Sequence, residues 1–257
     1  MLELNNFEGR VRDMAAKQLL ELQFQHNRQT QHNWERSRVH REAIHEHLVR
    51  YGNAALLRAY GAGNCNDLDL MELSKHFTAI ELVDIDTKAM ESALIRQNVN
   101  TEDGVRILGD IDLLSSAHVP SQPADVTVSS CLFTQLLEQF IEDNAATADL
   151  ISEFRRQHLN MLISGTSSQG HVYFITDLVS DLTAPQLKQL PNDQLNGFLS
   201  NLVERRNFFS GTNPFAILKQ LESDSRVHST NLLDAWKWTL GPRTFAVYGI
   251  HAQLDTN

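Results

Sequence analysis

Hydrophobic positions along the first fifty residues follow the spacing of helices and contain no strand-like run. Residues 7–26 and residues 34–51 each place apolar side chains three or four positions apart. A passage rich in Gln, Asn and His, residues 25–33, joins the two stretches. We predict two helices here, and we interpret residues 1–52 as a helical N-terminal cap that precedes the main domain, residues 53–257.

Short apolar runs replace this pattern from residue 54 onward. Predicted strands occupy residues 54–60, 79–83, 105–108, 125–130 and 171–176. Helical patterns lie between them, the first of which carries Leu68, Met71, Leu73 and Phe77, and the Gly/Ser-rich residues 164–170 are interpreted as the turn before the last strand. Strands that alternate with helices imply βαβ crossovers and therefore a parallel sheet.

The C-terminal part of the chain departs from this alternation. Residues 194–206 carry one apolar helical face, and Thr212-Asn213-Pro214 has the form of a helix start, with a capping side chain before a proline. Two extended runs, residues 236–240 and 243–251, flank Gly241-Pro242. They predict a terminal antiparallel hairpin.

Small and polar residues gather where the predicted strands end. These ends are Gly61–Asn66, Asp84–Asp86, Gly109–Asp112, Ser129–Phe133 and Asp177–Asp181. Ligands of open parallel sheets bind outside the carboxyl ends of the strands. The sequence therefore predicts a binding site for a polar ligand at this edge.

The segment Gly61-Ala62-Gly63 stands between a predicted strand and a predicted helix. Glycines there let the backbone approach a ligand closely, and the following helix offers free N–H groups. Asp84 lies 23 residues after Gly61, at the end of the second predicted strand. A carboxylate there can accept hydrogen bonds from both hydroxyls of a ribose. A dinucleotide-binding fingerprint would have a third glycine where this chain has Asn66, and an ordinary tight turn is the alternative interpretation.

The segment Leu57–Asp86 resembles the class I S-adenosylmethionine-dependent methyltransferases, whose first motif is a strand followed by a Gly-x-Gly loop and whose second strand ends in a ribose-binding acid. Residues 108–112 resemble the next motif of that family, in which an Asp binds the adenine amino group. Residues 125–133 resemble its fourth-strand motif, beside the methyl-transfer centre. Residues 171–177 fit its fifth strand, and residues 236–252 fit its closing hairpin.

The resemblance implies a three-layer, Rossmann-like α/β fold with a mostly parallel sheet, an antiparallel C-terminal hairpin and S-adenosylmethionine as the cofactor. The cofactor-binding residues that it implies are Gly61, Ala62, Gly63, Asn64, Asp84, Ile85, Asp110, Ile111, Ser129 and Cys131. For Asp86 we favour a different role, as the N-cap of the helix that starts at Thr87.

Two positions depart from the family pattern. Ala59 stands where the family commonly has an acid that helps to hold the methionine ammonium group, and Cys65 stands where it commonly has a third glycine. Asn64, Asn66 or Asp67 could substitute for the missing acid from within the loop.

Residues of the acceptor site and of catalysis are harder to infer. Trp34, Arg38, Tyr51 and Phe133, from the cap and the fourth-strand loop, are the candidates for the acceptor side. No catalytic residue is predicted, because methyl transfer from an activated sulfonium needs mainly positioning and desolvation.

No metal site is predicted. His40, His45 and His47 crowd one helix, but their spacing does not match the i, i+4 pairing of a helical zinc site, and we interpret them as a solvated helix face.

The charge balance narrows the choice of partners. The 22 Lys and Arg residues against 32 Asp and Glu residues give a net charge of −10, which argues against nucleic acid and against an anionic membrane surface. Two cysteines form no disulfide framework, and the first residues lack the features of a signal peptide, so we expect a cytoplasmic location.

These observations together predict an S-adenosylmethionine-dependent methyltransferase that acts on a small-molecule acceptor. One alternative is a non-catalytic, Rossmann-like binding module, which Ala59 and Cys65 would favour. The other is a nicotinamide-dependent oxidoreductase, which would also use a glycine turn and a ribose-binding acid.

Overall fold

A computed structural model describes residues 21, 23–51, 54–113, 120–143 and 147–256 of the chain. Residues 1–20 of the predicted cap lie outside it, as do residues 145 and 146 of a predicted helix. Within the described part, residues 23–30 are helical and lead to α2 (Arg38–Leu48) and the short η1 (Val49–Tyr51). The division of the chain at residue 52 stays a prediction.

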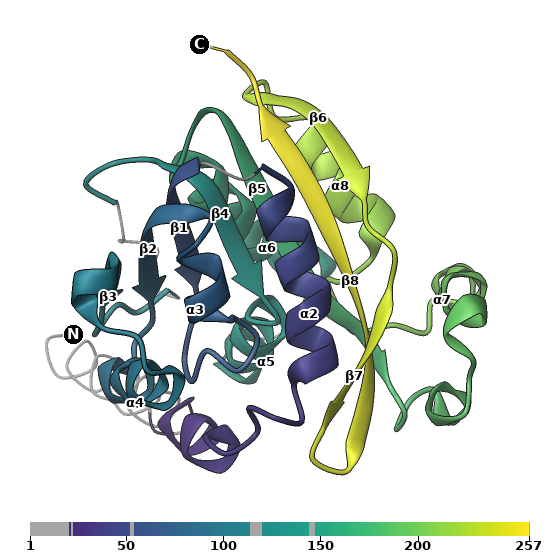
Figure 1. The fold of residues 1–257 in the computed structure, drawn as a ribbon. Coiled ribbons are helices and arrows are strands. Elements are labelled where there is room, and N and C mark those ends of the chain that lie inside the picture. The colour runs from purple at the N-terminus through teal and green to yellow at the C-terminus, as the bar shows by residue number, and fades with distance from the viewer. Residues whose placement is uncertain (1–20, 22, 52–53, 114–119, 144–146, 257) are drawn as a thin grey trace, which may run out of the picture.

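One sheet forms the centre of the molecule (Figure 1). Its strands are β1 (Ala54–Tyr60), β2 (Phe77–Val83), β3 (Val105–Leu108), β4 (Ala124–Ser130), β5 (Thr166–Ser180), β6 (Val227–Leu232), β7 (Trp236–Leu240) and β8 (Arg243–Leu254). They are ordered β3-β2-β1-β4-β5-β8-β6, and β7 also pairs with β8. Strands β1 to β5 run parallel, whereas β8 is antiparallel to β5, β6 and β7. The predicted mostly parallel α/β sheet and its terminal hairpin are confirmed.

Helices cover both faces of the sheet, which gives the three predicted layers (Figure 1). Core side chains of α2, α3 (Leu70–Leu73) and α4 (Thr87–Gln97) pack on one face. Those of α5 (Phe133–Asp143), α6 (Ala148–Ser164), α7 (Leu195–Glu204) and α8 (Pro214–Glu222) belong to the core of the other face. Four short 3-10 turns complete the described elements, η1, η2 (Thr101–Asp103), η3 (Pro185–Lys188) and η4 (Asn192–Gln194).

Local signals in the sequence account for several of these boundaries. The side chain of Asp86 accepts a hydrogen bond from the backbone N–H of Ala89, as predicted for the N-cap of α4. Asn213 caps α8 in the same way, with Pro214 in the first turn. Helix α4 ends where Asn98 adopts a left-handed conformation (φ 52°), which is a common helix stop.

Three expectations about the strands were wrong. Phe77 opens β2 rather than closing the preceding helix, because its side chain is buried in the sheet core. Strand β5 begins at Thr166, so residues 166–170 of the predicted turn belong to the strand, whereas Ser164 ends α6 and Gly165 is its C-cap. The register of β5 against β4 shifts between Ala124 and Val126. Strand β6 was not predicted, because an edge strand that is half exposed carries no apolar run.

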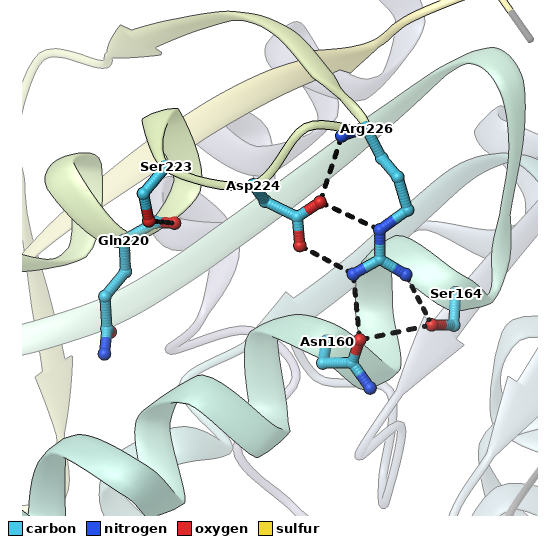
Figure 2. Close-up of polar contacts among 6 residues, drawn as sticks. All are labelled: Asn160, Ser164, Gln220, Ser223, Asp224 and Arg226. Carbon is cyan, nitrogen blue, oxygen red and sulfur yellow. Dashed lines mark hydrogen bonds and ion pairs between the residues drawn. The ribbon is translucent and has the colours of Figure 1, made fainter.

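A polar network fastens the turn between α8 and β6 to α6 (Figure 2). Asp224 accepts hydrogen bonds from Nε and Nη2 of Arg226, and the same guanidinium group donates to Ser164 and Asn160 at the end of α6. One planar cation thus holds three neighbours and places the unpredicted edge strand.

None of the helices in the described part of the chain combines the length and apolarity that a membrane span requires.

Candidate functional site

A cleft lies at the carboxyl ends of β1, β2 and β4, where the sequence predicted a ligand site. We call it the main cleft. It brings together eight of the ten residues that the resemblance implied for cofactor binding: Gly61, Ala62, Gly63, Asn64, Asp84, Ile85, Ile111 and Cys131. Residues of the cap, Gln23, His26, Asn27 and Thr30, form its other wall.

The glycine loop has a backbone that favours glycine. Gly61 and Gly63 adopt φ angles of 72° and 43°, in the left-handed region. A Cβ atom on Gly61 would lie 2.7 Å from the Leu132 side chain, and one on Gly63 would lie 2.9 Å from Oδ1 of Asn27. The two glycines therefore allow both a tight turn and close approach from the cleft side.

Cys65, which replaces the family's third glycine, does not narrow the cleft. Its φ angle of 47° keeps the left-handed turn that a glycine would make. Its side chain is fully buried in the core beneath α2, α3 and α4, and it does not line the main cleft. The loop thus tolerates a cysteine because the side chain turns inward.

Asp84 connects the end of β2 to the glycine loop. Its Oδ2 accepts a hydrogen bond from the backbone N–H of Gly63 and its Oδ1 accepts one from that of Asp86, each at 2.9 Å. The side chain is 8% exposed, and burial raises the pKa of its carboxyl group while the backbone donors oppose that rise. Because the carboxylate also lines the main cleft, it can accept further hydrogen bonds from a ligand.

Asp67 is the loop residue that offers a carboxylate to the cleft. Nδ2 of Asn64 and Nδ2 of Asn66 donate to cap residues Asn27 and Thr30, so both side chains are held against the cap and neither carries a charge. The carboxylate of Asp67 lines the cleft instead, and burial raises its pKa to about 6 against the lowering effects of Ser130 and Arg41. Of the three substitutes that the sequence suggested, the geometry favours Asp67.

The cap segment, residues 23–30, closes over this loop. Asn27 donates from Nδ2 to Oδ2 of Asp86, and its carbonyl oxygen accepts from the side chain of Asn64 at 2.7 Å. The main cleft consequently has a cavity volume of about 100 Å³. A neighbouring cavity beyond Asn27 is lined by Asp110, and Asn27, Asn64 and Ile85 line both. The segment thus divides one groove into two.

Two predicted cofactor residues lie outside the main cleft. Asp110 is exposed, with a left-handed backbone (φ 57°), and lines the neighbouring cavity. Ser129 is fully buried, and its hydroxyl pairs with Nε2 of His158 at 2.9 Å on the far side of β4. Ser130 lines the cleft in its place, because successive strand residues face opposite sides of a sheet.

Three of the four acceptor candidates, those whose side chains the structure describes, do not line the main cleft. Trp34 stacks beneath the guanidinium group of Arg41, 3.4 Å from the ring centroid, and Arg38 is exposed beside Glu42. Phe133 is fully buried in the α5–α8 core. The side chain of Tyr51 lies outside the described residues. The placement of Trp34, Arg38 and Phe133 reflects α2 and α5 packing on the sheet.

His40, interpreted from the sequence as solvated, is instead 1% exposed and lines the main cleft. Its Nδ1 accepts the indole N–H of Trp236 at 2.9 Å, so its proton is on Nε2, which faces Sγ of Cys131 at 4.0 Å. Trp238 stacks on the ring at 4.4 Å, and burial lowers the pKa of His40 to about 3. His40 is therefore a neutral donor and not a base.

A second cavity opens from the main cleft towards β5, with a volume of about 560 Å³. His26, Cys131, Gln135, Trp238 and Leu240 line both spaces. Sequence reasoning did not identify this cavity, although Asp177, one of its residues, stands at a predicted strand end. No cluster of three or more potential metal ligands occurs among the described residues.

Replacing His158 by glutamine is expected to make the protein less sensitive to acid. Burial lowers the pKa of His158 to about 4, whereas an unfolded histidine titrates near 6.5. Between these values the unfolded chain binds a proton that the folded chain does not, so stability is lost as pH falls from about 6.5 to about 4. For each pH unit in this range, the free energy of unfolding of the variant should therefore fall by up to about 1.4 kcal/mol less than that of the wild type.

Urea unfolding at several pH values between 7 and 5 measures this difference. The exposed His32, replaced in the same way, is the control. Equal acid sensitivity of the His158→Gln variant and the wild type would contradict the lowered pKa of His158 in the folded protein.

Comparisons with known proteins establish the fold. No protein-family model matches the chain, and no curated protein matches its sequence. Solved structures do match, and one is the N-methyltransferase NodS from Bradyrhizobium japonicum WM9, with 11% identity over 88% of this chain and 99% of that one, at a TM-score of 0.51. Another is a possible exported protein from Bordetella parapertussis, with 11% identity over 86% and 68% of the two chains and a TM-score of 0.53. The YcgJ protein from Bacillus subtilis has 9% identity over 85% and 99%, with a TM-score of 0.51.

At these identities the likeness concerns the fold alone. The chain therefore has the fold that the resemblance to class I methyltransferases predicted, and a protein named as an N-methyltransferase shares that fold along almost its whole length.

Proposed function

We propose that this protein is an S-adenosylmethionine-dependent methyltransferase that acts on a small-molecule acceptor. The observation that carries the proposal is the charge of the main cleft. Asp67 and Asp84 line it, and none of its described lining residues is a lysine or an arginine. S-adenosylmethionine carries a sulfonium and an ammonium group, so a cleft with two carboxylates and no fixed cation suits it.

The same charge argues against the nicotinamide alternative. The pyrophosphate of a dinucleotide would lie against the glycine loop, where two carboxylates would repel it and where the described lining of the main cleft contains no lysine or arginine. The position of the third dinucleotide-binding glycine is also occupied by Asn66.

The residues present fit the parts of the cofactor. Asp84 would hold the ribose hydroxyls, and Ile85 and Ile111 would flank the adenine, with Asp110 at its amino group. Asp67 would hold the methionine ammonium group, in place of the acid that the family commonly has at the position of Ala59. Bound S-adenosylmethionine supplies an electrophilic methyl group, and the chain orients it and excludes water.

Ala59 and Cys65, which favoured a non-catalytic module, are compatible with cofactor binding in this arrangement. Cys65 points into the core and leaves the cleft unchanged, and Asp67 offers the carboxylate that position 59 does not. An acceptor cavity of about 560 Å³ adjoins the cleft, within the range of small-molecule sites.

Cofactor entry requires the cap segment to move. A cavity of about 100 Å³ is well below the roughly 300 Å³ or more that small-molecule sites enclose. The contacts that must open are those of Asn27 with Asp86 and Asn64. Displacing Asn27 would join the main cleft to the cavity lined by Asp110, which gives one continuous groove.

Calorimetric titration with S-adenosylmethionine, with NAD as the comparison, tests the proposal. We expect S-adenosylmethionine to bind in the micromolar range, at about −8 kcal/mol, and NAD to bind at least 100-fold more weakly. Absence of S-adenosylmethionine binding at millimolar concentration, or tighter binding of NAD, would overturn it.

Replacing Asp67 by asparagine tests the methionine end of the site. We expect at least tenfold weaker binding of both S-adenosylmethionine and S-adenosylhomocysteine, since both carry the ammonium group. Binding of 5′-methylthioadenosine, which has the ribose and adenine but lacks the α-ammonium group of the methionine part, should stay within twofold. A Glu102→Gln variant removes an exposed charge on η2 as the control. Equal weakening of all three ligands would contradict a role of Asp67 at the ammonium group.

A further inference from the structure

The second cavity combines aromatic walls with a buried carboxylate. Trp238, Phe209 and Phe245 supply aromatic surface, and Asp177 is the most buried of its charged residues. Cys131 lies at the junction with the main cleft, and the charges of both Asp67 and Asp177 help to raise the pKa of its thiol. Asp177 is therefore close to the passage through which the two spaces communicate.

The backbone aims Asp177 at this cavity. The register between β5 and β8 shifts between Asp177 and Val179, so Leu178 is an extra residue on β5. A bulge of this kind redirects the neighbouring side chains, and bulges are frequent beside active sites.

The carboxylate of Asp177 is only partly satisfied within the protein. Oδ1 accepts a hydrogen bond from the hydroxyl of Thr134 at 2.5 Å, and the residue is 7% exposed. No lysine, arginine or histidine of the described chain forms an ion pair with it within 4.0 Å. Burial raises its pKa to about 6, and the charge of Glu138 adds to that rise. The carboxylate of Asp177 therefore has no cationic partner within 4.0 Å among the described residues.

The other charged groups of the cavity leave it negative. Glu138 is a second carboxylate on its wall, and Arg243 on the hairpin turn is a cation; both are exposed, so with the buried Asp177 the described lining has two carboxylates against one guanidinium group. His26 and Cys131 also line the cavity: burial lowers the pKa of His26 and raises that of the Cys131 thiol, which favours the neutral form of both. An anionic or neutral polar acceptor would gain little from such a lining, whereas a cationic one would be attracted.

We propose that the acceptor is an amine attached to an aromatic or alkyl body, and that Asp177 binds its nitrogen and accepts its proton. This inference rests on the proposed function. Thr134 is a positioning residue, since its hydroxyl fixes one carboxylate oxygen and leaves the other for the acceptor. The aromatic walls would hold the apolar body and add cation–π attraction to the ammonium form.

The reaction balances without any further reagent. The bound ammonium passes one proton to Asp177, and the lone pair of the resulting amine forms the new N–C bond. The C–S bond breaks with its electron pair on sulfur, which leaves a neutral thioether and a secondary ammonium product. Asp177 releases its proton to solvent when the product leaves.

Matched probes test this acceptor class. Phenethylamine and tryptamine are titrated into the protein saturated with S-adenosylhomocysteine, and compared with the neutral 2-phenylethanol and tryptophol and the anionic 3-phenylpropanoate. We expect the amines to bind at least tenfold more tightly than the alcohols, and 3-phenylpropanoate to bind most weakly. Methyl transfer from labelled S-adenosylmethionine should be detectable only to the amines.

An Asp177→Asn variant should lose that tenfold preference and keep its affinity for S-adenosylmethionine within twofold. Thr134→Val should lose part of the preference, and Glu102→Gln should keep all of it. Thermal unfolding of each variant confirms that the fold is intact.

Alcohols that bind as well as amines, a preference retained in Asp177→Asn, or no amine binding at millimolar concentration would each overturn the inference. Failure of S-adenosylmethionine itself to bind would instead overturn the proposed function, so the two failures are distinguishable.

Discussion

Replacement of Asp84 by alanine is expected to lower the affinity for S-adenosylmethionine at least 100-fold. The carboxylate holds the N–H groups of Gly63 and Asp86, and it lines the main cleft where the ribose would lie. Its loss removes the proposed ribose acceptor and releases the glycine loop at the same time. Charge-assisted hydrogen bonds of this kind contribute roughly 1.5–3 kcal/mol each, so loss of two or more of them supports a factor of this size.

Calorimetric titration measures the effect, and two further variants separate its causes. Asp84→Asn keeps one acceptor oxygen, so it should bind more tightly than the alanine variant. Asp69→Ala removes a carboxylate that also accepts a backbone N–H, that of Glu72, but does not line the cleft. It should lose stability and keep cofactor affinity. Unchanged affinity in Asp84→Ala would refute the placement of the ribose at this residue.

Replacement of Arg58 by leucine is expected to destabilise the protein by about 3–5 kcal/mol. Arg58 is 0% exposed and faces Glu81, its register partner on β2, with two donors on Oε2 at 2.9 and 2.7 Å. Its guanidinium group also donates to the carbonyl oxygens of Gly165 and Gln122. The variant would leave a buried carboxylate with only the longer contact to the half-exposed Arg106, at 3.5 Å.

Urea unfolding of three variants distinguishes the buried charge from the lost packing. The double variant Arg58→Leu with Glu81→Leu removes both charges and should recover about 1–3 kcal/mol of the loss. Arg106→Ala, which removes only the exposed partner, should cost less than about 1 kcal/mol. A double variant that is no more stable than Arg58→Leu alone would show that the unpaired charge of Glu81 is not the cause.

The positions of the five parallel strands along the chain and the glycine loop could be predicted because their signals are local. Strand β1 is an apolar run in which Arg58 is the one charged residue. The loop after it contains the two glycines that adopt positive φ angles. Asp86 was predicted as a capping residue, and so was one of Thr212 and Asn213, because a cap needs only neighbouring backbone donors; the structure has Asp86 and Asn213 as the caps.

The wrong predictions concern residues whose sequence pattern fits either a solvent- or ligand-facing position or a buried one. Ser129 was expected in the pocket and Phe133 beside it, but one step along a strand or helix moves a side chain from one face to another. His40 was interpreted as solvated, yet β7 packs against α2 and buries it beneath Trp236 and Trp238. The half-exposed β6 left no periodic signal at all.

By itself, therefore, the sequence determined most of the elements, the position of the glycine loop and the acid at the end of β2. Hydrophobic periodicity, glycine conformations and helix caps each depend on residues within one or two turns of each other. Only the tertiary structure decided which carboxylates face the site. Asp67 lines the main cleft beside Asn64 and Asn66, whose Nδ2 groups donate to the cap. Asp177 enters the second cavity because β5 bulges against β8, and both contacts join segments that are far apart in the chain.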